Sequence, residues 1–415
     1  MAKALDIYLH QNLAGQLVQD RHGQMGFSYA EAWLKHPEVV PLSHSLPLRE
    51  KPFDRNECRG FFGGILPEAA NRIIIAKNLG ISTKNDFAML EQIGGECAGA
   101  VTFMPAGERL QQSDYRYRHL TNKELAEILK TLPKRPLLAG DKDIRLSLAG
   151  AQDKIAVHVA DGQISVPLGG APSTHILKPD IERFKGMVFN EALCMKLAGA
   201  IGLHAAQAEV GQVEGIDYLL VERYDRKKAQ HPPASTDLER VHQEDFCQAL
   251  GIPSENKYQN EGGPSLKQCF ALLREVSSVP VIDLQRLLDA VIFNFLVGNH
   301  DAHGKNFSIT YPEVDEARLA PLYDVVSTVF YPELSPKMAM KFGGEYVSDK
   351  VSPKHFETLA SEAGLAKPMV RSRVSELAKT ILSQIAESTS RYPKARPVAE
   401  LIQSRCERTI RKFKA

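Results

Sequence analysis

The segment GNHDAHGKNF, residues 298–307, holds side chains that phosphoryl transfer requires. Asp301 stands five positions before Asn306. An aspartate can accept the proton of an attacking hydroxyl, and an asparagine oxygen can bind a magnesium ion. A short loop after a buried helix could aim both side chains into one cleft. The pattern predicts Asp301 as a general base and Asn306 as a magnesium ligand, with a polar turn as the structural alternative.

Asp324, in LAPLYDVVS, could supply a second magnesium ligand at the end of an apolar segment. The spacing of Asp301 and Asn306 is that of the catalytic loop H-R-D-x-x-x-x-N of protein kinases. Mg²⁺ takes few protein ligands and completes its shell with water and phosphate. One carboxylate and one amide therefore suit a nucleotide-borne ion, although a turn or a helix cap would also explain Asp324.

Upstream residues could bind the phosphates of that nucleotide. Lys178 ends the strand HILK, and Glu191 on the following helix could pair with it. The loop from Ser147 to Lys154, SLAGAQDK, carries small residues whose backbone N–H groups could approach phosphate oxygens, with Lys154 neutralising charge. It matches neither common glycine-rich phosphate motif, so a tight turn remains the alternative.

The segment LLVERYDR, residues 219–226, stands where a kinase hinge would begin. There the backbone of Glu222 to Tyr224 could hydrogen-bond an adenine edge, and the ring of Tyr224 could lie against it. An edge strand with a half-buried aromatic side chain is the alternative. Phosphate loop, lysine strand, helix, hinge, catalytic loop and metal aspartate thus follow one another in kinase order.

The elements needed to position these residues can be predicted from the patterning. Hairpins are expected in LDIYLHQNLAGQLVQ, around Asp161-Gly162 and around Glu214-Gly215, and a strand in AGAVTFMP. Helices are expected from Thr121, in FNEALCMKLAGAIG, and in most of the chain from about Val241, beginning with HQEDFCQALG. The loop from Ser147 is expected to join two strands.

Strands first and helices second indicate an α+β fold with two lobes, of which the C-terminal lobe is mainly helical. We predict an N-terminal subdomain at 1–106, a linker and helix at 107–140, an N-lobe at 141–240 and a helical C-lobe at 241–415. Residues 107–117 are the predicted linker.

Composition excludes several classes of protein. The 415 residues carry a net charge of +1, which argues against a strongly basic nucleic-acid binder. No apolar run reaches the ~20 residues of a membrane span. Six scattered cysteines form no C-x-x-C pair, so reduced thiols and a cytoplasmic location are expected, with no membrane partner.

Taken together, the motifs resemble HipA-type serine/threonine kinases, the toxins of bacterial toxin–antitoxin modules. The resemblance rests on SLAGAQDK, STHILKPD, NEALCMKLA, VERYDR, HQEDFCQALG, GNHDAHGKNF and LAPLYDVVST, and on PLSHSLPL and FFGGILPE near the N-terminus. It implies a two-lobed kinase-like fold with an added N-terminal α/β subdomain. It also implies ATP and Mg²⁺ as cofactors, Asp301 as catalytic base, Asn306 and Asp324 as metal ligands, and Ser147 as an autophosphorylated serine. The implied nucleotide contacts are Ala149, Gly150, Ala151, Gln152, Asp153, Lys154, Lys178, Glu222, Arg223, Tyr224, His303, Gly304, Lys305 and Tyr323.

The resemblance also implies partners. Such kinases phosphorylate an aminoacyl-tRNA ligase, best known for glutamate, which stalls translation and leads to growth arrest or persistence. A small helix-turn-helix antitoxin, HipB-like, would hold the toxin on operator DNA as a heterotetramer, with direct DNA contact at most minor, at Lys367, Arg371 and Arg373. Two alternatives stay open, a catalytically silent corepressor that binds antitoxin and DNA, and a small-molecule kinase.

Overall fold

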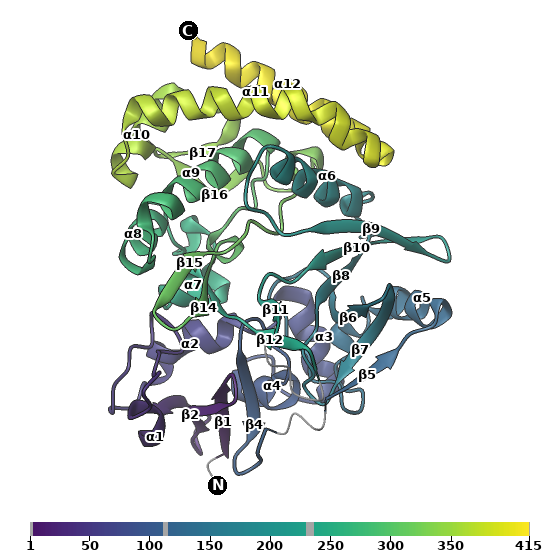
Figure 1. Cartoon of the computed structure of the whole chain (residues 1–415), viewed down its shortest axis with the longest axis vertical. Coiled ribbons are helices and arrows are strands. Elements are labelled where there is room, and N and C mark those ends of the chain that lie inside the picture. The colour runs from purple at the N-terminus through teal and green to yellow at the C-terminus, as the bar shows by residue number, and fades with distance from the viewer. Residues whose placement is uncertain (1–2, 111–114, 230–235, 415) are drawn as a thin grey trace. The chain divides into compact units, whose positions relative to one another are not determined.

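The computed structural model describes residues 3–110, 115–229 and 236–414. These residues form two compact units (Figure 1). Unit 1 contains the described residues up to Pro179, together with Gly211–Glu255 and Ile309–Ala317. Unit 2 contains Asp180–Val210, Asn256–Ser308 and the described residues from Arg318 onward.

Unit 1 begins with a four-stranded antiparallel sheet of order β3-β2-β1-β4. Its strands are β1 (Lys3–Leu9), β2 (Asn12–Gln19), β3 (Met25–Tyr29) and β4 (Val101–Pro105). The predicted first hairpin is confirmed, since Leu5 pairs with Leu17 and Ile7 with Gly15. The helices of this region are α1 (Glu31–Leu34), α2 (Arg55–Gly64), α3 (Ala69–Leu79) and α4 (Asp86–Ile93).

A second sheet has six strands in the order β5-β7-β6-β8-β10-β9, and it belongs to unit 1 except for the first three residues of β9. They are β5 (Arg116–His119), β6 (Ile155–Ala160), β7 (Gln163–Leu168), β8 (His175–Pro179), β9 (Ala208–Val213) and β10 (Ile216–Glu222). The hairpin turn between β6 and β7 places Asp161 and Gly162 at positive φ, as an Asp-Gly turn requires. The predicted helix from Thr121 is α5 (Asn122–Thr131), which Thr121 and Glu124 cap reciprocally.

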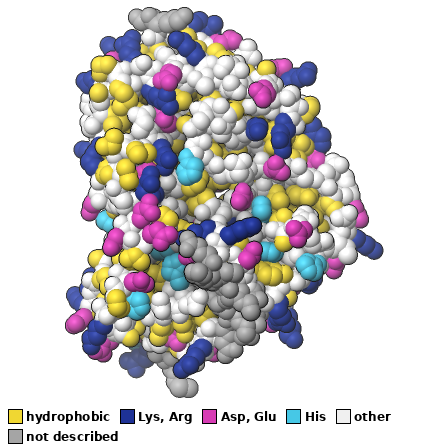
Figure 2. Space-filling model, in the orientation of Figure 1, with side chains coloured by type: hydrophobic (Ala, Val, Ile, Leu, Met, Phe, Trp, Pro, Cys, Tyr) yellow, Lys and Arg dark blue, Asp and Glu magenta, His cyan; other side chains and the backbone are white. Residues whose placement is uncertain are grey.

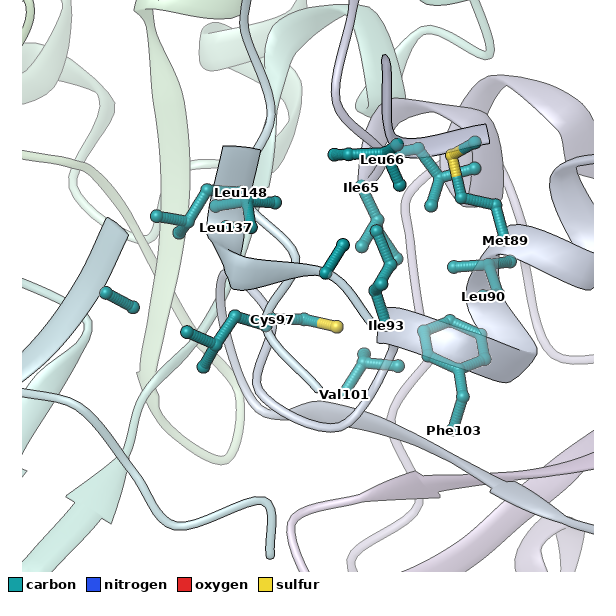
Figure 3. Packing of buried hydrophobic residues seen from close by; sticks show 14 of the residues in the cluster. Ile65, Leu66, Met89, Leu90, Ile93, Cys97, Val101, Phe103, Leu137 and Leu148 are labelled. Atoms are coloured by element: carbon teal, nitrogen blue, oxygen red, sulfur yellow. The ribbon is translucent and has the colours of Figure 1, made fainter. Parts of the chain in front are cut away.

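One continuous apolar core joins the N-terminal region to the six-stranded sheet. Figure 3 shows Leu137 and Leu148 packed among side chains from residues 65–103, including Cys97. Leu148 belongs to the predicted phosphate loop and is buried. The core of unit 1 therefore anchors one end of that loop.

Smaller strands and a short helix complete unit 1, except that residue 308 of β14 and residues 318 and 319 of β15 belong to unit 2. They are β11 (Arg226–Lys228), β12 (Leu238–Arg240), β13 (His242–Asp245), α7 (Phe246–Ala249), β14 (Ser308–Glu313) and β15 (Glu316–Leu319). The strands β13, β14 and β15 form one sheet, in that order.

Unit 2 is mainly helical. Its helices are α6 (Met187–Ala200), α8 (Leu266–Val276), α9 (Pro280–Val297), α10 (Pro353–Ala363), α11 (Lys367–Arg391) and α12 (Arg396–Lys414), and β16 (Lys337–Phe342) pairs with β17 (Glu345–Val347). The long helix α11 packs against α6, α9, α10 and α12 (Figure 1). Helix α9 is buried along most of its length and ends at Gly298, whose φ is +77°.

Three expectations about elements are wrong. HQEDFCQALG is not wholly helical, because His242–Asp245 form β13, which pairs in a sheet before the short α7 begins. The predicted linker overlaps β5, which pairs with β7, and its residues 111–114 lie outside the described part. The loop from Ser147 leads into β6 but follows only an isolated bridge between Glu96 and Leu146. The four predicted domain ranges stay predictions.

Among the described residues, none of the helices has the length and apolar character needed to cross a bilayer.

Candidate active site

The end of α9 leads directly into the predicted catalytic loop. Asn294 and Asn299 form a chain of amide contacts there: Asn299 Nδ2 donates to Asn294 Oδ1 at 2.8 Å, and Asn299 Oδ1 accepts from the Asp301 backbone N–H at 3.1 Å. Asn294 Nδ2 is itself bound to the carbonyl of Ala290 at 2.9 Å. Both asparagines are buried, so the amides tie the backbone of Asp301 to the helix.

The carboxylate of Asp301 is exposed to solvent and in contact with Tyr258. The Tyr258 hydroxyl donates to Asp301 Oδ1 at 2.7 Å. The Asp301 carbonyl accepts from the His303 N–H at 2.8 Å, and the His303 carbonyl accepts from the Asn306 N–H at 2.9 Å. Successive turns therefore carry the chain from the predicted base to the predicted metal ligand.

Asn306 and Asp324 lie side by side in unit 2, although 18 positions separate them in sequence. Asn306 Nδ2 donates to Asp324 Oδ2 at 3.3 Å. Asn306 Oδ1 is buried and has no hydrogen-bond partner among the residues that the structure describes. Because buried carbonyl oxygens normally have a partner, this atom is suited to a cation.

The donor set of Asn306 and Asp324 fits Mg²⁺ better than a metal that requires a full protein shell. Among the described residues, no group of three or more His, Cys, Asp and Glu side chains forms a metal-binding cluster. With one amide oxygen and one carboxylate as protein ligands, most coordination positions of Mg²⁺ remain for phosphate oxygens and water. The pair therefore suits an ion that arrives with a nucleotide.

The remaining loop residues are held by Tyr323, which precedes Asp324. Its hydroxyl lies 2.8 Å from the carbonyl of Lys305 and 2.7 Å from Ser308 Oγ. Lys305 and His303 are both buried. Burial holds the pKa of His303 well below its ordinary value, and the nearby cations Lys257 and Lys305 lower it further. His303 is therefore neutral at physiological pH.

The predicted phosphate loop lies in unit 1 and packs against residues 65–71. Ser147 is fully buried, and its Oγ donates to the carbonyl of Ile65 at 3.0 Å. The carbonyls of Gly150 and Ala151 accept from the Glu68 N–H at 3.2 Å and from Asn71 Nδ2 at 3.1 Å. A Cβ on Gly150 would stand 2.7 Å from Lys154 Nζ, so the lysine ammonium lies close against the loop backbone.

The predicted hinge begins at Glu222, which is exposed, and continues into a buried ionic network. The guanidinium of Arg223 binds both oxygens of Asp225, at 2.9 and 2.7 Å, and lies 3.2 Å from Glu96. The Tyr224 hydroxyl donates to Gln243 Oε1. The side chain of Arg223 is therefore committed to the protein interior, which leaves only its backbone for the predicted nucleotide contact.

Other predicted residues are placed separately. Lys178 is buried in β8 of unit 1, and Glu191 is buried in α6 of unit 2, so their pairing stays a prediction.

The predicted DNA contacts Arg371 and Arg373 have carboxylate partners. Arg373 binds Asp289 at 2.7 and 2.9 Å, and Arg371 lies 3.4 Å from Glu357, whereas Lys367 is exposed.

The surface in Figure 2 agrees with the small net charge. Lys and Arg side chains are interspersed there with Asp and Glu side chains. Contact of this chain with DNA phosphates stays a prediction.

Comparison with known proteins assigns the chain to a family. The model of the HipA N-terminal domain matches residues 5–104, and that of the HipA-like C-terminal domain matches residues 146–385. The chain belongs to the HipA family. Its α+β fold is accordingly the kinase-like HipA fold, and the first matched region covers the N-terminal sheet β3-β2-β1-β4 except for residues at its two ends.

Similar proteins match this chain over nearly its whole length. A protein of Sinorhizobium fredii named "Putative kinase Y4mE" is 48% identical over 92% of this chain and 91% of its own. The serine/threonine-protein kinase toxin HipA of Shewanella oneidensis is 28% identical over 92% of this chain and 88% of its own. The solved complex of Shewanella oneidensis HipA, HipB and operator DNA matches with a TM-score of 0.86 at 27% identity, covering 99% of this chain and 98% of that one.

Several residues that shape the site were not predicted from the sequence. Asn294, Asn299 and Tyr258 support Asp301, and Asn190 binds the backbone of Ser327, three positions after Asp324, at 2.9 and 3.1 Å. A sequence signal exists only for Asn294 in α9 and Asn190 in α6, which are polar residues within apolar helices. Such a signal indicates a buried contact without naming the partner.

Proposed function

We propose that this chain is an ATP-dependent serine/threonine protein kinase that acts as the toxin of a toxin–antitoxin pair. One observation carries the proposal: the side-chain amide of Asn306, whose buried Oδ1 has no hydrogen-bond partner among the described residues, lies against Asp324, and Asn306 stands five positions after Asp301. Family membership and the names of the relatives support the same reaction.

The residues divide the work of phosphoryl transfer. Bound Mg·ATP would supply the phosphoryl group and neutralise charge as it transfers. Asn306 and Asp324 would hold the ion, and the backbone of residues 149–154 with Lys154 and Lys178 would bind the phosphates. Asp301 would accept the proton of the attacking serine hydroxyl. Glu222 to Tyr224 would face the adenine through their backbone.

The proposed protein substrate is an aminoacyl-tRNA ligase, of which glutamate–tRNA ligase is the first candidate, so that phosphorylation would stall translation and arrest growth. The proposed partner is a HipB-like helix-turn-helix antitoxin, bound in a heterotetramer on operator DNA. Support for that partner comes from the matched Shewanella complex, which contains HipA, HipB and operator DNA.

Autophosphorylation at Ser147 is the proposed off-switch. The hydroxyl of Ser147 is buried against Ile65, so a phosphate cannot be added while the loop keeps this conformation. A phosphoserine would bring about −1.5 to −2 charges to a buried position. It would therefore hold the loop out of place, and ATP would lose its phosphate contacts.

Transfer of label from [γ-³²P]ATP into a bacterial lysate tests the proposal. We expect a labelled band whose mass identifies an aminoacyl-tRNA ligase. Asp301→Ala should lower the rate by about 10²–10⁴, the usual effect of losing a general base. Labelling of the same band at the wild-type rate by Asp301→Ala would contradict the role of Asp301, and turnover confined to metabolites would contradict a protein substrate.

A further inference from the structure

Tyr258 touches the catalytic loop at two places. Its hydroxyl donates to Asp301 Oδ1 at 2.7 Å, and its ring meets the ring of His303 edge to face, with centroids 5.4 Å apart. All three residues belong to unit 2. Tyr258 is therefore placed against both the predicted base and the turn that follows it.

The segment that presents Tyr258 is a tightly closed loop. The carbonyl of Tyr258 accepts from the Glu261 N–H at 2.9 Å and from the Gly263 N–H at 2.8 Å. Gly262 has a φ of +100°, and a Cβ on Gly263 would stand 2.4 Å from the carbonyl oxygen of Asn256. Both glycines are thus required by the backbone, and the loop holds Tyr258 in one position.

A second anchor ties this loop to the sheet of unit 2. Gln259 Oε1 accepts from the Lys341 N–H, in β16, at 2.7 Å. The residue after Tyr258 is therefore fixed independently of the catalytic loop. The hydrogen bond from Tyr258 to Asp301 joins two separately anchored segments.

The exposed position of Asp301 explains why such a contact matters. A solvated aspartate samples several side-chain rotamers, and a general base is effective only when it lies within hydrogen-bond reach of the proton it accepts. A carboxylate accepts several hydrogen bonds, so Asp301 can be held by Tyr258 and still accept a proton from a substrate hydroxyl. Orientation of this kind contributes to the rate rather than to the affinity for the nucleotide.

We propose that Tyr258 is a positioning residue that fixes the carboxylate of Asp301 for proton transfer. The inference rests on the proposed kinase activity and adds to it a residue outside the kinase-like motifs. Tyr258 does not itself receive or release the substrate proton. It holds Asp301 at Oδ1, and the carboxylate of Asp301 accepts the proton.

Tyr258→Phe is the test, because it removes the hydroxyl and keeps the ring on His303. Tyr346→Phe is the matched control, since Tyr346 also lies in unit 2 and contacts Lys341 through its ring, with the ammonium 5.0 Å from the centroid. Transfer of label from [γ-³²P]ATP to casein is measured as kcat and KM for ATP. We expect Tyr258→Phe to lower kcat by about ten-fold with KM within about two-fold, and Tyr346→Phe to match the wild type.

The other outcomes contradict the proposal in distinguishable ways. An active wild type with unchanged kcat in Tyr258→Phe would overturn the role of Tyr258 alone. A higher kcat in that variant would show that the phenol competes with the substrate hydroxyl. A fall in Tm together with a higher KM would assign Tyr258 to loop packing. A wild type that transfers no label to casein or to lysate proteins would overturn the kinase activity and, with it, this inference.

Discussion

Asp324 combines a predicted role in metal binding with an unusual backbone. Its φ is +57°, in the left-handed region that aspartate and asparagine tolerate better than other side chains. The same residue accepts the hydrogen bond from Asn306 Nδ2. Asparagine at this position would keep the backbone conformation while removing the negative charge.

Asp324→Asn should therefore weaken magnesium use without unfolding the chain. We expect the Mg²⁺ concentration for half-maximal phosphoryl transfer to rise by about 10- to 100-fold. Loss of a residue that only hydrogen-bonds a metal ligand already lowers metal affinity by that factor. Asp315→Asn is the matched control, because Asp315 has a φ of +65° in an exposed turn. Identical magnesium curves for Asp324→Asn and the wild type would remove Asp324 from the metal site.

At the scale of residues, the sequence predicted the candidate catalytic and metal-binding side chains, but it did not predict the residues that hold them in place. The spacing of Asp301 and Asn306 is local, so a pattern could reveal it. The contact from Tyr258 spans 43 positions and depends on where an irregular loop closes. Arg223 was expected to contact the nucleotide, and nothing in the local pattern showed that its side chain would pair with Glu96, which lies 127 positions away.

At the scale of elements, the C-terminal helix α12 supports the helix that leads to the catalytic loop. Arg405, in α12, is buried and donates to the carbonyls of Phe295 at 2.8 Å and Leu296 at 3.3 Å. These carbonyls belong to the last turn of α9, where helical partners run out. A cation at this end also complements the helix dipole.

Arg405→Met should destabilise unit 2, because it keeps the apolar stem and leaves those carbonyls without their donor. We expect the free energy of unfolding to fall by about 2–3 kcal/mol. Arg408→Met, which removes an exposed pair with Asp349 at 3.2 Å, should cost less than about 1 kcal/mol. Urea unfolding measures both, and equal losses would argue against a special role for Arg405.

Helix periodicity predicted the position of several helices, but it did not predict which side chains of the C-terminal helix α12 are buried. The helix in FNEALCMKLAGAIG and its end before Gly202 were expected from apolar spacing, and α6 confirms them. The basic run SRCERTIRKFKA gave no sign that Arg405 would be buried while Arg408 and Arg411 stay exposed. Only the packing of α12 against α9 decides which cation faces inward.

At the scale of the whole molecule, a buried carboxyl makes stability depend on pH. Burial raises the pKa of Glu244 to about 7, although hydrogen bonds from Ser43, Tyr311 and the His44 N–H partly oppose the rise. The folded chain therefore favours the protonated form. Its stabilising contribution is complete below the ordinary pKa of about 4.5 and is lost as the pH rises through 7.

Glu244→Gln should flatten this dependence, since glutamine is neutral at every pH. We expect the wild type to lose up to about 3 kcal/mol of unfolding free energy relative to this variant between pH 5 and pH 8. Urea unfolding across that range measures the difference. Glu239→Gln, at a partly exposed carboxylate, should keep the wild-type slope, and a wild-type slope in Glu244→Gln would contradict the assignment.

The fold class could be predicted because element order and family motifs extend along nearly the whole chain. The shared core of unit 1 could not, since it joins residues such as Phe103 and Leu148 from opposite sides of the predicted linker. Long-range packing of this kind leaves no periodic pattern in a single sequence.

The central claim is that Asn306 and Asp324 together bind the cation of a bound nucleotide. A crystal structure with the ATP analogue AMP-PNP and Mn²⁺ tests it most directly, because manganese gives an anomalous signal. We predict a peak ~2.2 Å from Asn306 Oδ1 and from the Asp324 carboxylate, bridged to the phosphates. Bound nucleotide whose manganese is held by other side chains would contradict the account.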